Sequence, residues 1–307
     1  MKTQPLRILC LRSGALGDFM VLLPALAALR SSNPGAVIHL ATRPSYGELA
    51  RACGLADEIS SIDSAGWAAV FGADGFAPAE RMRLASFDCV VNCLHDPDGV
   101  VAANLRAAVP GRLLNIPGRL GSTHAARHFM APLLDAGLVS GRLQTFRLKI
   151  KPMPLPAGIG PLPFGPRAVA LHPGSGSPVK NWPAGRYAAL AAGLEQSREW
   201  RPFFIFGEAD ARVEEEIVRL APEARRMGNL SLLQLAAVLG KCAAYVGNDS
   251  GVTHLAAGLG LKVTALFGPS DPEIWRPCGR SVRVIKARPD FGDLGVERVL
   301  KAVMSRA

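Results

Sequence analysis

The sequence predicts two α/β domains in tandem, each built on a parallel sheet with helices on both faces. Short and nearly continuous apolar runs alternate with segments of helical periodicity, and this alternation stops only once, in a segment rich in proline and glycine. Continuous apolar strands are typical of parallel sheets that are buried on both faces. With 307 residues, of which 49% are hydrophobic, the chain is long enough to form two such cores.

The first domain is expected over residues 1–150. Between its first two strands, Leu22, Leu23, Leu26 and Leu29 recur at near-helical spacing, and Pro24 is expected to kink this helix. The strands of this domain are expected at Leu6–Leu11, Val37–Ala41, Ile59–Ile62, Phe87–Leu94 and Leu113–Ile116.

Residues 151–166 are expected to link the domains, because a segment so rich in proline forms neither a regular helix nor a central strand. The second domain is expected over residues 167–292, followed by a C-terminal helix within residues 293–307. Its strands are expected at Ala168–Leu171, Phe203–Phe206, Ala243–Val246 and Val263–Phe267. Its helices are expected at Pro183–Gln196, Ala211–Leu220, Leu232–Leu239, His254–Leu259 and Val296–Met304.

Composition narrows the class of protein. No secretory leader and no apolar run of about 18 residues is evident, so a cytoplasmic protein is expected. The six cysteines form no CxxC pair, which disfavours a zinc site or a disulfide framework. The net charge of +10 indicates an anionic partner. The basic residues are scattered and only 6% of residues are aromatic, which argues against nucleic acid as that partner.

Two segments of the second domain have the composition of anion-binding turns. In LHPGSGSPVKNWP, residues 171–183, small residues and Lys180 lie between a strand and a helix. Such a loop cradles phosphate through backbone N–H groups and a lysine charge, unless it is simply a solvated loop. In AYVGNDSGVTHLAAGLG, residues 244–260, several polar residues meet at a strand-to-helix turn. Helix capping alone requires fewer polar residues than this, so ligand binding is expected.

A third segment, LRSGALGDFMVLLPAL at residues 11–26, places Asp18 between a glycine turn and an apolar helix. The residues alone leave three roles open for Asp18: a helix cap, part of a cofactor loop, or a catalytic carboxylate.

Together these segments and ALFGPSDPEIWRP, residues 265–277, resemble the ADP-heptose:lipopolysaccharide heptosyltransferases of glycosyltransferase family 9. The resemblance implies a GT-B fold, with two Rossmann-like αβα domains that face each other across a cleft. It also implies an inverting, metal-independent transfer of a heptose from ADP-heptose to the lipopolysaccharide inner core, without a cofactor. Donor contacts carried over by motif position fall on Ser175, Gly176, Ser177, Lys180, Asp249, Ser250, Gly251 and His254, with Glu208 or its neighbour Asp210 at the ribose.

In this family interpretation Asp18 is the general base, and Lys180 stabilises the leaving diphosphate. Gly14 and Gly17 let the acceptor approach the turn. An acidic acceptor is expected to dock on basic residues of the first domain, unless these form only a solvated basic face; the candidates are Arg106, Arg112, Arg119, Arg127 and His128. The positive charge further suggests peripheral contact with the anionic inner membrane, and a monomer is expected.

Three alternatives remain. Asp96 and Asp98 form a D-x-D pattern after an apolar strand, which binds a metal in GT-A transferases, although a plain turn has the same composition. An NAD-dependent oxidoreductase would need a GxGxxG turn where this chain has Gly14-x-x-Gly17-Asp18. A catalytically silent nucleotide-sugar-binding protein would not require Asp18.

Overall fold

The computed structural model describes residues 4–72, 75–116, 121–141, 147–150 and 164–305. The chain divides into two compact units, one formed by residues 1–14 and 21–144 and the other by residues 15–20 and 145–307. The short segment Ala15–Met20 therefore groups with the second unit, whereas the sequence analysis assigned all of residues 1–150 to the first domain. The two units are described separately below.

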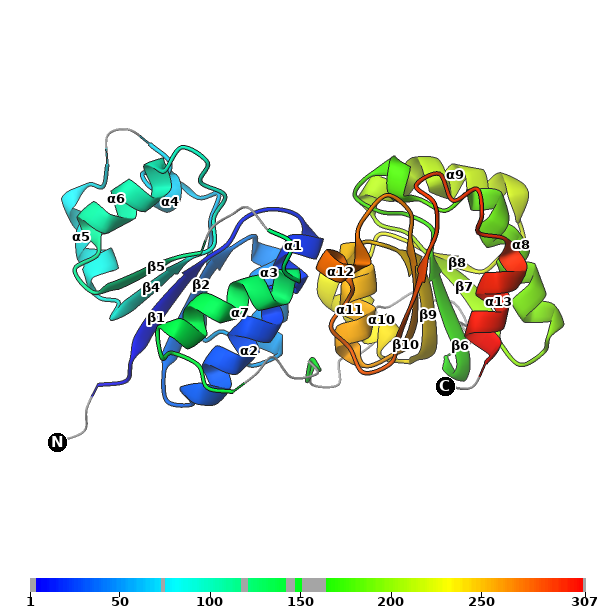
Figure 1. Cartoon of the computed structure of the whole chain (residues 1–307), viewed down its shortest axis with the longest axis horizontal. Coiled ribbons are helices and arrows are strands. Elements are labelled where there is room, and N and C mark those ends of the chain that lie inside the picture. Colours follow the sequence, from blue (N-terminus) through cyan, green and yellow to red (C-terminus); the bar gives the residue numbers. More distant parts are fainter. Residues whose placement is uncertain (1–3, 73–74, 117–120, 142–146, 151–163, 306–307) are drawn as a thin grey trace. The chain divides into compact units, whose positions relative to one another are not determined.

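The first unit contains a five-stranded parallel sheet in the order β3-β2-β1-β4-β5. Its strands are β1 (Arg7–Leu11), β2 (Val37–Thr42), β3 (Glu58–Ser61), β4 (Cys89–Asn92) and β5 (Arg112–Asn115). Its helices are α2 (Leu23–Ser32), α3 (Pro44–Ala52), α4 (Ala65–Ala68), α5 (Pro78–Ala85), α6 (Val100–Ala108) and α7 (Ala125–Asp135). Helices α4, α5 and α6 pack on one face of the sheet and share a core with β1 and β4 (Figure 1).

The second unit contains a six-stranded parallel sheet in the order β11-β10-β9-β6-β7-β8. Its strands are β6 (Gly165–His172), β7 (Arg201–Ile205), β8 (Arg226–Met227), β9 (Cys242–Asn248), β10 (Lys262–Phe267) and β11 (Val282–Lys286). Its α-helices are α1 (Leu16–Met20), α8 (Ala184–Gln196), α9 (Ala211–Leu220), α10 (Leu232–Leu239), α11 (Gly251–Leu259), α12 (Pro272–Trp275) and α13 (Val296–Met304). Two short 3₁₀ helices, η1 (Pro178–Lys180) and η2 (Glu208–Asp210), follow β6 and β7.

Helices α8, α9 and α13 cover one face of the second sheet, and α10 and α11 lie side by side (Figure 1). Trp182 just precedes α8 and Tyr187 lies within it. Both side chains are fully buried in the core between the sheet and helices α8, α9 and α13, with their ring centroids 5.0 Å apart. The indole Nε1 of Trp182 donates to the carbonyl of Leu294 at 3.0 Å. The chain that enters α8 is therefore fixed to the core at Trp182.

Two predicted details need correction. The helix expected around Leu22 is interrupted by a turn at residues 21–22, and Pro24 lies in the first turn of α2, where its missing N–H costs no hydrogen bond. Strand β6 begins at Gly165 and includes Pro166, inside the predicted linker. The pairing of β6 with β9 shifts between Gly165 and Val169, and this irregularity accommodates a proline in a central strand. The rest of that linker, residues 151–163, lies outside the described residues.

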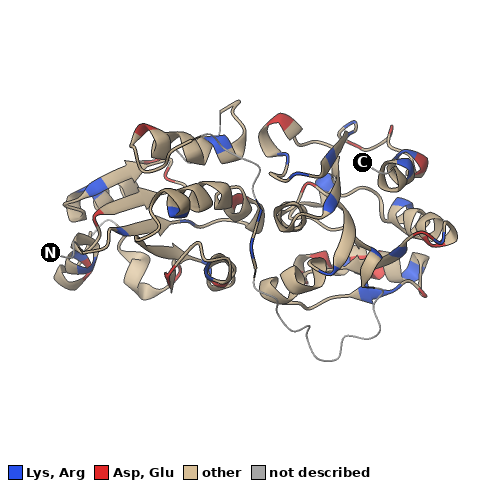
Figure 2. Ribbon diagram, turned by 90° about the horizontal axis from the view of Figure 1, so that it is seen from below, with Lys and Arg blue, Asp and Glu red and all other residues tan. Residues whose placement is uncertain are grey.

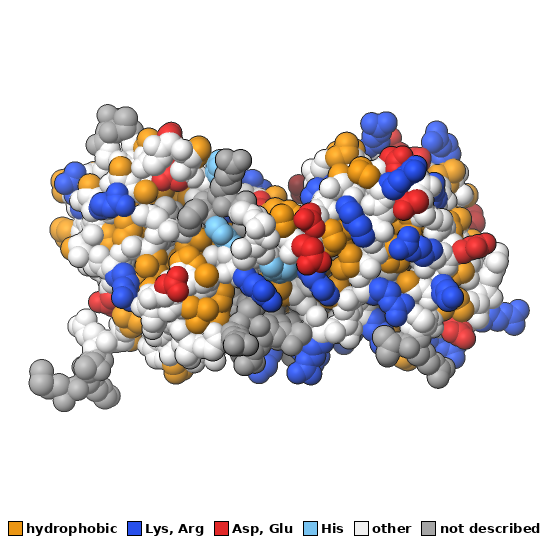
Figure 3. All heavy atoms as spheres, in the orientation of Figure 1, with side chains coloured by type: hydrophobic (Ala, Val, Ile, Leu, Met, Phe, Trp, Pro, Cys, Tyr) orange, Lys and Arg blue, Asp and Glu red, His pale blue; other side chains and the backbone are white. Residues whose placement is uncertain are grey.

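Charged side chains are spread over the second unit rather than gathered in one stripe. Figure 2 shows Lys and Arg interspersed with Asp and Glu along its ribbon, and both signs are present on the face seen in Figure 3. Some pair directly, as do Arg225 and Glu195 at 2.7 Å. None of the helices in the described part of the chain combines the length and the hydrophobicity needed to cross a membrane.

Candidate active site

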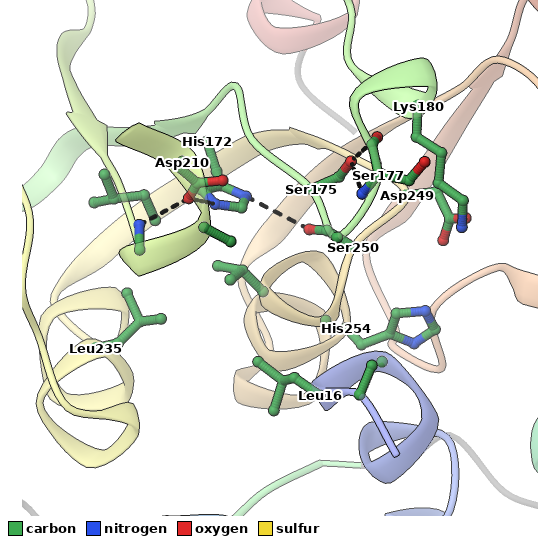
Figure 4. Close-up of a pocket in the computed structure, with 18 of the residues that line it drawn as sticks. Leu16, His172, Ser175, Ser177, Lys180, Asp210, Leu235, Asp249, Ser250 and His254 are labelled. Carbon is green, nitrogen blue, oxygen red and sulfur yellow. Dashed lines mark hydrogen bonds and ion pairs between the residues drawn. The ribbon is translucent and has the colours of Figure 1, made fainter. Parts of the chain in front are cut away.

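A pocket of about 520 Å³ lies at the carboxyl ends of β6, β7 and β9 in the second unit. Strand order reverses between β6 and β9, and ligands of open α/β sheets bind at such switch points. The volume is typical of a small-molecule site. Figure 4 shows the polar side chains of the loops after β6 and β9 facing the pocket, with α1 along one side.

The side chain of Asn248 is completely buried and fixes the conformation of the loop after β6 through hydrogen bonds. Its Nδ2 donates to the carbonyl of Pro173 at 2.8 Å, and its Oδ1 accepts from the backbone N–H of Trp182 at 3.0 Å and the hydroxyl of Tyr187 at 3.2 Å. One amide thus fastens both ends of residues 173–182. Because each of these bonds has a fixed direction, only an amide fits here.

The hydroxyl of Ser175 is directed into the same loop. It lies 2.6 Å from the carbonyl of Ser177 and 2.6 Å from Oδ1 of Asn181, and it accepts from the N–H of Ser177 at 3.2 Å. Ser175 was predicted to hold the donor diphosphate together with Gly176 and Lys180. These bonds of its hydroxyl shape the turn, and Gly176 beside it is exposed.

Lys180, at the end of this loop, forms an ion pair with Asp249, at the end of β9. The distance between Nζ and Oδ2 is 2.7 Å, and the Asp249 side chain is 7% exposed while that of Lys180 is 35% exposed. The ammonium group therefore lies at the pocket wall and is oriented by a carboxylate that is itself nearly buried.

A second acid–base pair lies beneath the loop. Oδ2 of Asp210 is 3.0 Å from Nε2 of His172 and accepts from the N–H of Gly207 at 2.7 Å. Burial alone would raise the pKa of Asp210, but the hydrogen bond and charge of His172, together with the Gly207 N–H, hold that pKa below its ordinary value. The carboxylate lies so close to Gly174 that a Cβ there would be 1.8 Å from Oδ1. A residue with a side chain at position 174 would therefore collide with the Asp210 carboxylate, so this position needs a glycine.

Helix α11 begins at the pocket. The hydroxyl of Ser250 caps this helix by accepting from the N–H of Thr253 at 3.4 Å. A Cβ at Gly251 would lie 2.6 Å from Cγ of Leu16, so the missing side chain of Gly251 lets α1 pack against the first turn of α11.

Asp18 lies in α1 and lines the same pocket. Its Oδ2 accepts from the backbone N–H of Ala15 at 3.2 Å, so the carboxylate also caps the start of α1. The position of Asp18 is thus compatible with two of the three roles left open by the sequence, the helix cap and the catalytic carboxylate.

The predicted donor and catalytic residues all line this pocket; they are Asp18, Ser175, Gly176, Ser177, Lys180, Glu208, Asp249, Ser250, Gly251 and His254, with Gly17 beside them. Glu208 is exposed, whereas its neighbour Asp210 is buried and bonded to His172. Of the predicted acceptor residues, Gly14 belongs to the first unit, as do Arg106 on α6 and Arg127 on α7, both exposed. Arg119 lies outside the described residues.

Asp96 and Asp98 cap a helix. The two carboxylate oxygens of Asp96 accept from the N–H groups of Val101 and Ala102 at 3.0 and 2.8 Å, and Asp98 accepts from the N–H of Val100 at 3.4 Å. The D-x-D pattern is therefore explained by the start of α6. Among the residues that the structure describes, no group of three or more His, Cys, Asp or Glu side chains is arranged to hold a metal ion.

Sequence reasoning missed His172, Asn248 and Trp275. His172 and Asn248 end their strands inside the two motifs, so their position was a usable signal. Their partners lie in distant segments, however: Asp210 is in η2, and Asn248 bonds the loop after β6 and α8. Trp275, in α12, lines the pocket and lies within the segment 265–277 that carried the family resemblance.

The fold is that of the GT-B glycosyltransferases. The Escherichia coli heptosyltransferase WaaC, solved with ADP, superposes with a TM-score of 0.76 at 20% identity over 97% of this chain and 99% of that one. Residues 149–296 match the model of glycosyltransferase family 9 (heptosyltransferase).

Alignments with two curated relatives cover a little over a third of the chain. Lipopolysaccharide heptosyltransferase 2 of Salmonella typhimurium is 34% identical over 116 residues, which are 36% of this chain and 33% of that protein. Lipopolysaccharide heptosyltransferase 1 of Pseudomonas aeruginosa is 36% identical over 122 residues, 39% of this chain and 33% of that protein. The alignments thus span about a third of the length of these relatives.

Proposed function

We propose that the chain is an inverting, metal-independent glycosyltransferase that moves a heptose, or a related sugar, from ADP-heptose to an acidic acceptor of the lipopolysaccharide inner core. One observation carries the proposal: Asp18 lines the same pocket as Lys180 and the glycine-serine loop. A base and an anion-binding loop in one pocket are the two parts that such a transfer needs. The family 9 match and the names of the relatives support the choice of sugar and acceptor.

The donor diphosphate would lie between the loop after β6 and the start of α11. Both supply backbone N–H groups, and the N-terminal end of α11 adds partial positive charge. Lys180 adds a full charge at the pocket wall, and His254 lines the same pocket for contact with the sugar. Glu208 is the better candidate for the ribose hydroxyls, because it is exposed at the pocket while Asp210 is occupied by His172.

In the reaction an acceptor hydroxyl attacks the anomeric carbon from the face opposite the diphosphate. The new carbon–oxygen bond forms as the bond to the diphosphate oxygen breaks, so the configuration inverts. Asp18 takes the proton of the acceptor hydroxyl, and Lys180 with the loop N–H groups stabilises the charge gained by the departing ADP. This charge stabilisation comes from side chains and backbone, so the proposed mechanism includes no cofactor.

The acceptor side is proposed from charge alone. Arg106 and Arg127 are exposed on the first unit and are suited to phosphate or carboxylate groups of an acidic glycolipid. The net charge of +10 also supports peripheral contact with an anionic membrane surface.

The decisive experiment compares binding of ADP-heptose with UDP and GDP sugars and with NAD, and then measures transfer by an Asp18→Asn variant. We expect ADP-heptose to bind best, and Asp18→Asn to bind ADP like the wild type while losing at least about 100-fold in turnover. Turnover in EDTA should be unchanged. Tight binding of NAD alone would exclude a glycosyltransferase, and full turnover by Asp18→Asn would exclude Asp18 as the base.

A further inference from the structure

The pocket of the second unit is lined by loops that follow neighbouring strands of its sheet. Along the carboxyl edge these strands stand in the order β10-β9-β6-β7-β8. Their loops carry, in the same order, the pocket residues Trp275, Asp249, Lys180, Glu208 and Leu230. Because the strands are parallel and end at one edge, their order along the sheet is also the order of these residues along the pocket. Trp275 therefore lies at one end of the pocket and Leu230 at the other.

The two anion-binding turns, after β6 and after β9, stand in the middle of this row. In a nucleotide sugar the nucleoside and the sugar are attached to opposite ends of the diphosphate, so they would extend toward opposite ends of the pocket. On the side of β7 and β8, Phe206, Leu230 and Leu235 offer apolar contact to a base. Glu208 is on the same side for the ribose. The sugar to be transferred is left with the end at Trp275.

The loop between β10 and α12, which carries the chain to Trp275, is fixed by the segment that ends in and follows β11. Lys286, the last residue of β11, donates from its ammonium group to the carbonyls of Gly268 and Ser270, the latter at 2.9 Å. Phe291 packs so closely on this loop that a Cβ at Gly268 would lie 2.6 Å from the ring. The loop therefore has little freedom to move.

Helix α12 holds Trp275 itself. The side chain of Asp271 caps the helix by accepting from the N–H of Glu273 at 2.9 Å, and the N–H of Trp275 donates to the carbonyl of Asp271 at 3.0 Å. Trp275 is half-buried and lines the pocket. An aromatic ring on a fixed backbone loses little conformational entropy when a ligand stacks on it.

An indole suits a sugar ring better than it suits a phosphate. The C–H bonds on one face of the sugar carry partial positive charge, and the faces of an aromatic ring are negative. We propose that Trp275 is a specificity-determining residue that stacks on the sugar of the donor and contributes nothing to binding of the ADP part. The inference rests on the proposed function, because it takes the ligand to be an ADP-sugar.

Two variants of Trp275 and one control separate an aromatic contact from general damage to the protein. Trp275→Ala removes the ring, whereas Trp275→Phe keeps an aromatic face. The control is Trp200→Phe, because Trp200 is also partly buried but packs against the core of the second unit.

Binding is measured by titration calorimetry with ADP and with ADP-heptose in parallel. Trp275→Ala should raise the Kd for ADP-heptose about tenfold and leave the Kd for ADP within about twofold of the wild type. Trp275→Phe should bind ADP-heptose within about threefold of the wild type, because it keeps the stacking surface. Trp200→Phe should bind both ligands like the wild type.

Tryptophan emission gives a second measurement on the same proteins. The chain has four tryptophans, of which Trp67 and Trp182 are fully buried and Trp200 packs against a core, whereas Trp275 lines the pocket. ADP-heptose should therefore change the emission of the wild type more than ADP does. The extra change should persist in Trp200→Phe and disappear in Trp275→Phe.

The outcomes distinguish this inference from the proposed function. A wild type that does not bind ADP-heptose would refute both. A wild type that binds ADP-heptose but transfers no heptose would refute the proposed function alone, since the binding comparison does not depend on transfer. Equal losses for ADP and ADP-heptose in Trp275→Ala, or no loss for either, would refute the inference alone. If Trp275→Ala does not fold, emission decides, because an extra change that persists in Trp275→Phe would exclude contact between Trp275 and the sugar.

Discussion

Gly174 is the position where a single added methyl group tests the packing of the site most directly. A Cβ there would lie 1.8 Å from Oδ1 and 2.2 Å from Cγ of Asp210. Non-bonded heavy atoms prefer roughly 3.5 Å, so the loop or the carboxylate would have to move by more than about 1 Å. The carboxylate is held by His172 at 3.0 Å and by the N–H of Gly207 at 2.7 Å.

We therefore expect Gly174→Ala to be destabilising. Overpacking in a buried site costs about 1–3 kcal/mol, and breaking a buried ion pair costs about 3–5 kcal/mol. At about 3 kcal/mol, where the ranges meet, and about 2–4 °C per kcal/mol for a domain of this size, the Tm should fall by roughly 6–12 °C. Thermal unfolding followed by circular dichroism measures this fall.

Gly176 provides a matched control in the same loop. Neither glycine has a positive φ, and a Cβ at Gly176 would meet nothing within 4 Å, so the Tm of Gly176→Ala should stay within about 1 °C of the wild type. In an Asp210→Ala background the Gly174→Ala change should cost little, because the colliding atoms are gone. Equal Tm values for Gly174→Ala and Gly176→Ala, or an undiminished loss without Asp210, would refute the reasoning.

Three further outcomes are expected. Lys180→Ala should raise the Kd for ADP about tenfold or more, whereas the exposed Lys262→Ala should not; an unchanged Kd in titration calorimetry would contradict a phosphate role for Lys180. Asn248→Asp should lower the Tm by several degrees, because a carboxylate oxygen would face the carbonyl of the loop that Nδ2 now donates to, and a wild-type unfolding curve would count against that anchor. Since the pKa of Asp210 is lowered in the folded chain, its ionised form stabilises fully above the ordinary carboxyl pKa of about 3.9, and this stability is lost as the pH falls through the lower folded-state value. The Tm difference between wild type and Asp210→Asn should therefore shrink below about pH 4, and a difference that grows there would contradict the assignment.

Local sequence patterns predicted the five strands of the first sheet and most helices of the second unit, but not β11 or the helices α3 to α7. The predicted bounds of α9, α10 and α13 agree with the structure to the residue, because their periodic apolar positions and their ends are encoded nearby. The two-residue strand β8 was not predicted, since so short a strand is defined only by its neighbour β7. The assignment of α1 to the second unit also depends on distant contacts, in particular the fit of Leu16 on Gly251.

In the candidate site, too, features encoded by contiguous residues were predicted and features that depend on distant contacts were not. Lys180, Asp249 and the glycine-serine loop were found from their motifs, because each motif is contiguous along the chain. The pairing of His172 with Asp210 could not be found in this way, since the two residues are 38 positions apart and meet only when β6 pairs with β7. Asn248 was visible in its motif, but its role as an anchor depends on Trp182 and on carbonyl groups of another loop.

The membership of Ala15–Met20 in the second unit bears on how such a chain can be recombined. The backbone passes from one unit to the other at residues 14–15 and 20–21 and again near residue 145, so no single breakpoint separates the two units. A fragment starting at Thr145 would keep Lys180 and Asp249 but lack Asp18. A chimera that took residues 1–144 from another protein would import a foreign α1, and that helix would have to fit against the bare backbone of Gly251. Exchange of the first unit therefore also exchanges one wall of the pocket in the second.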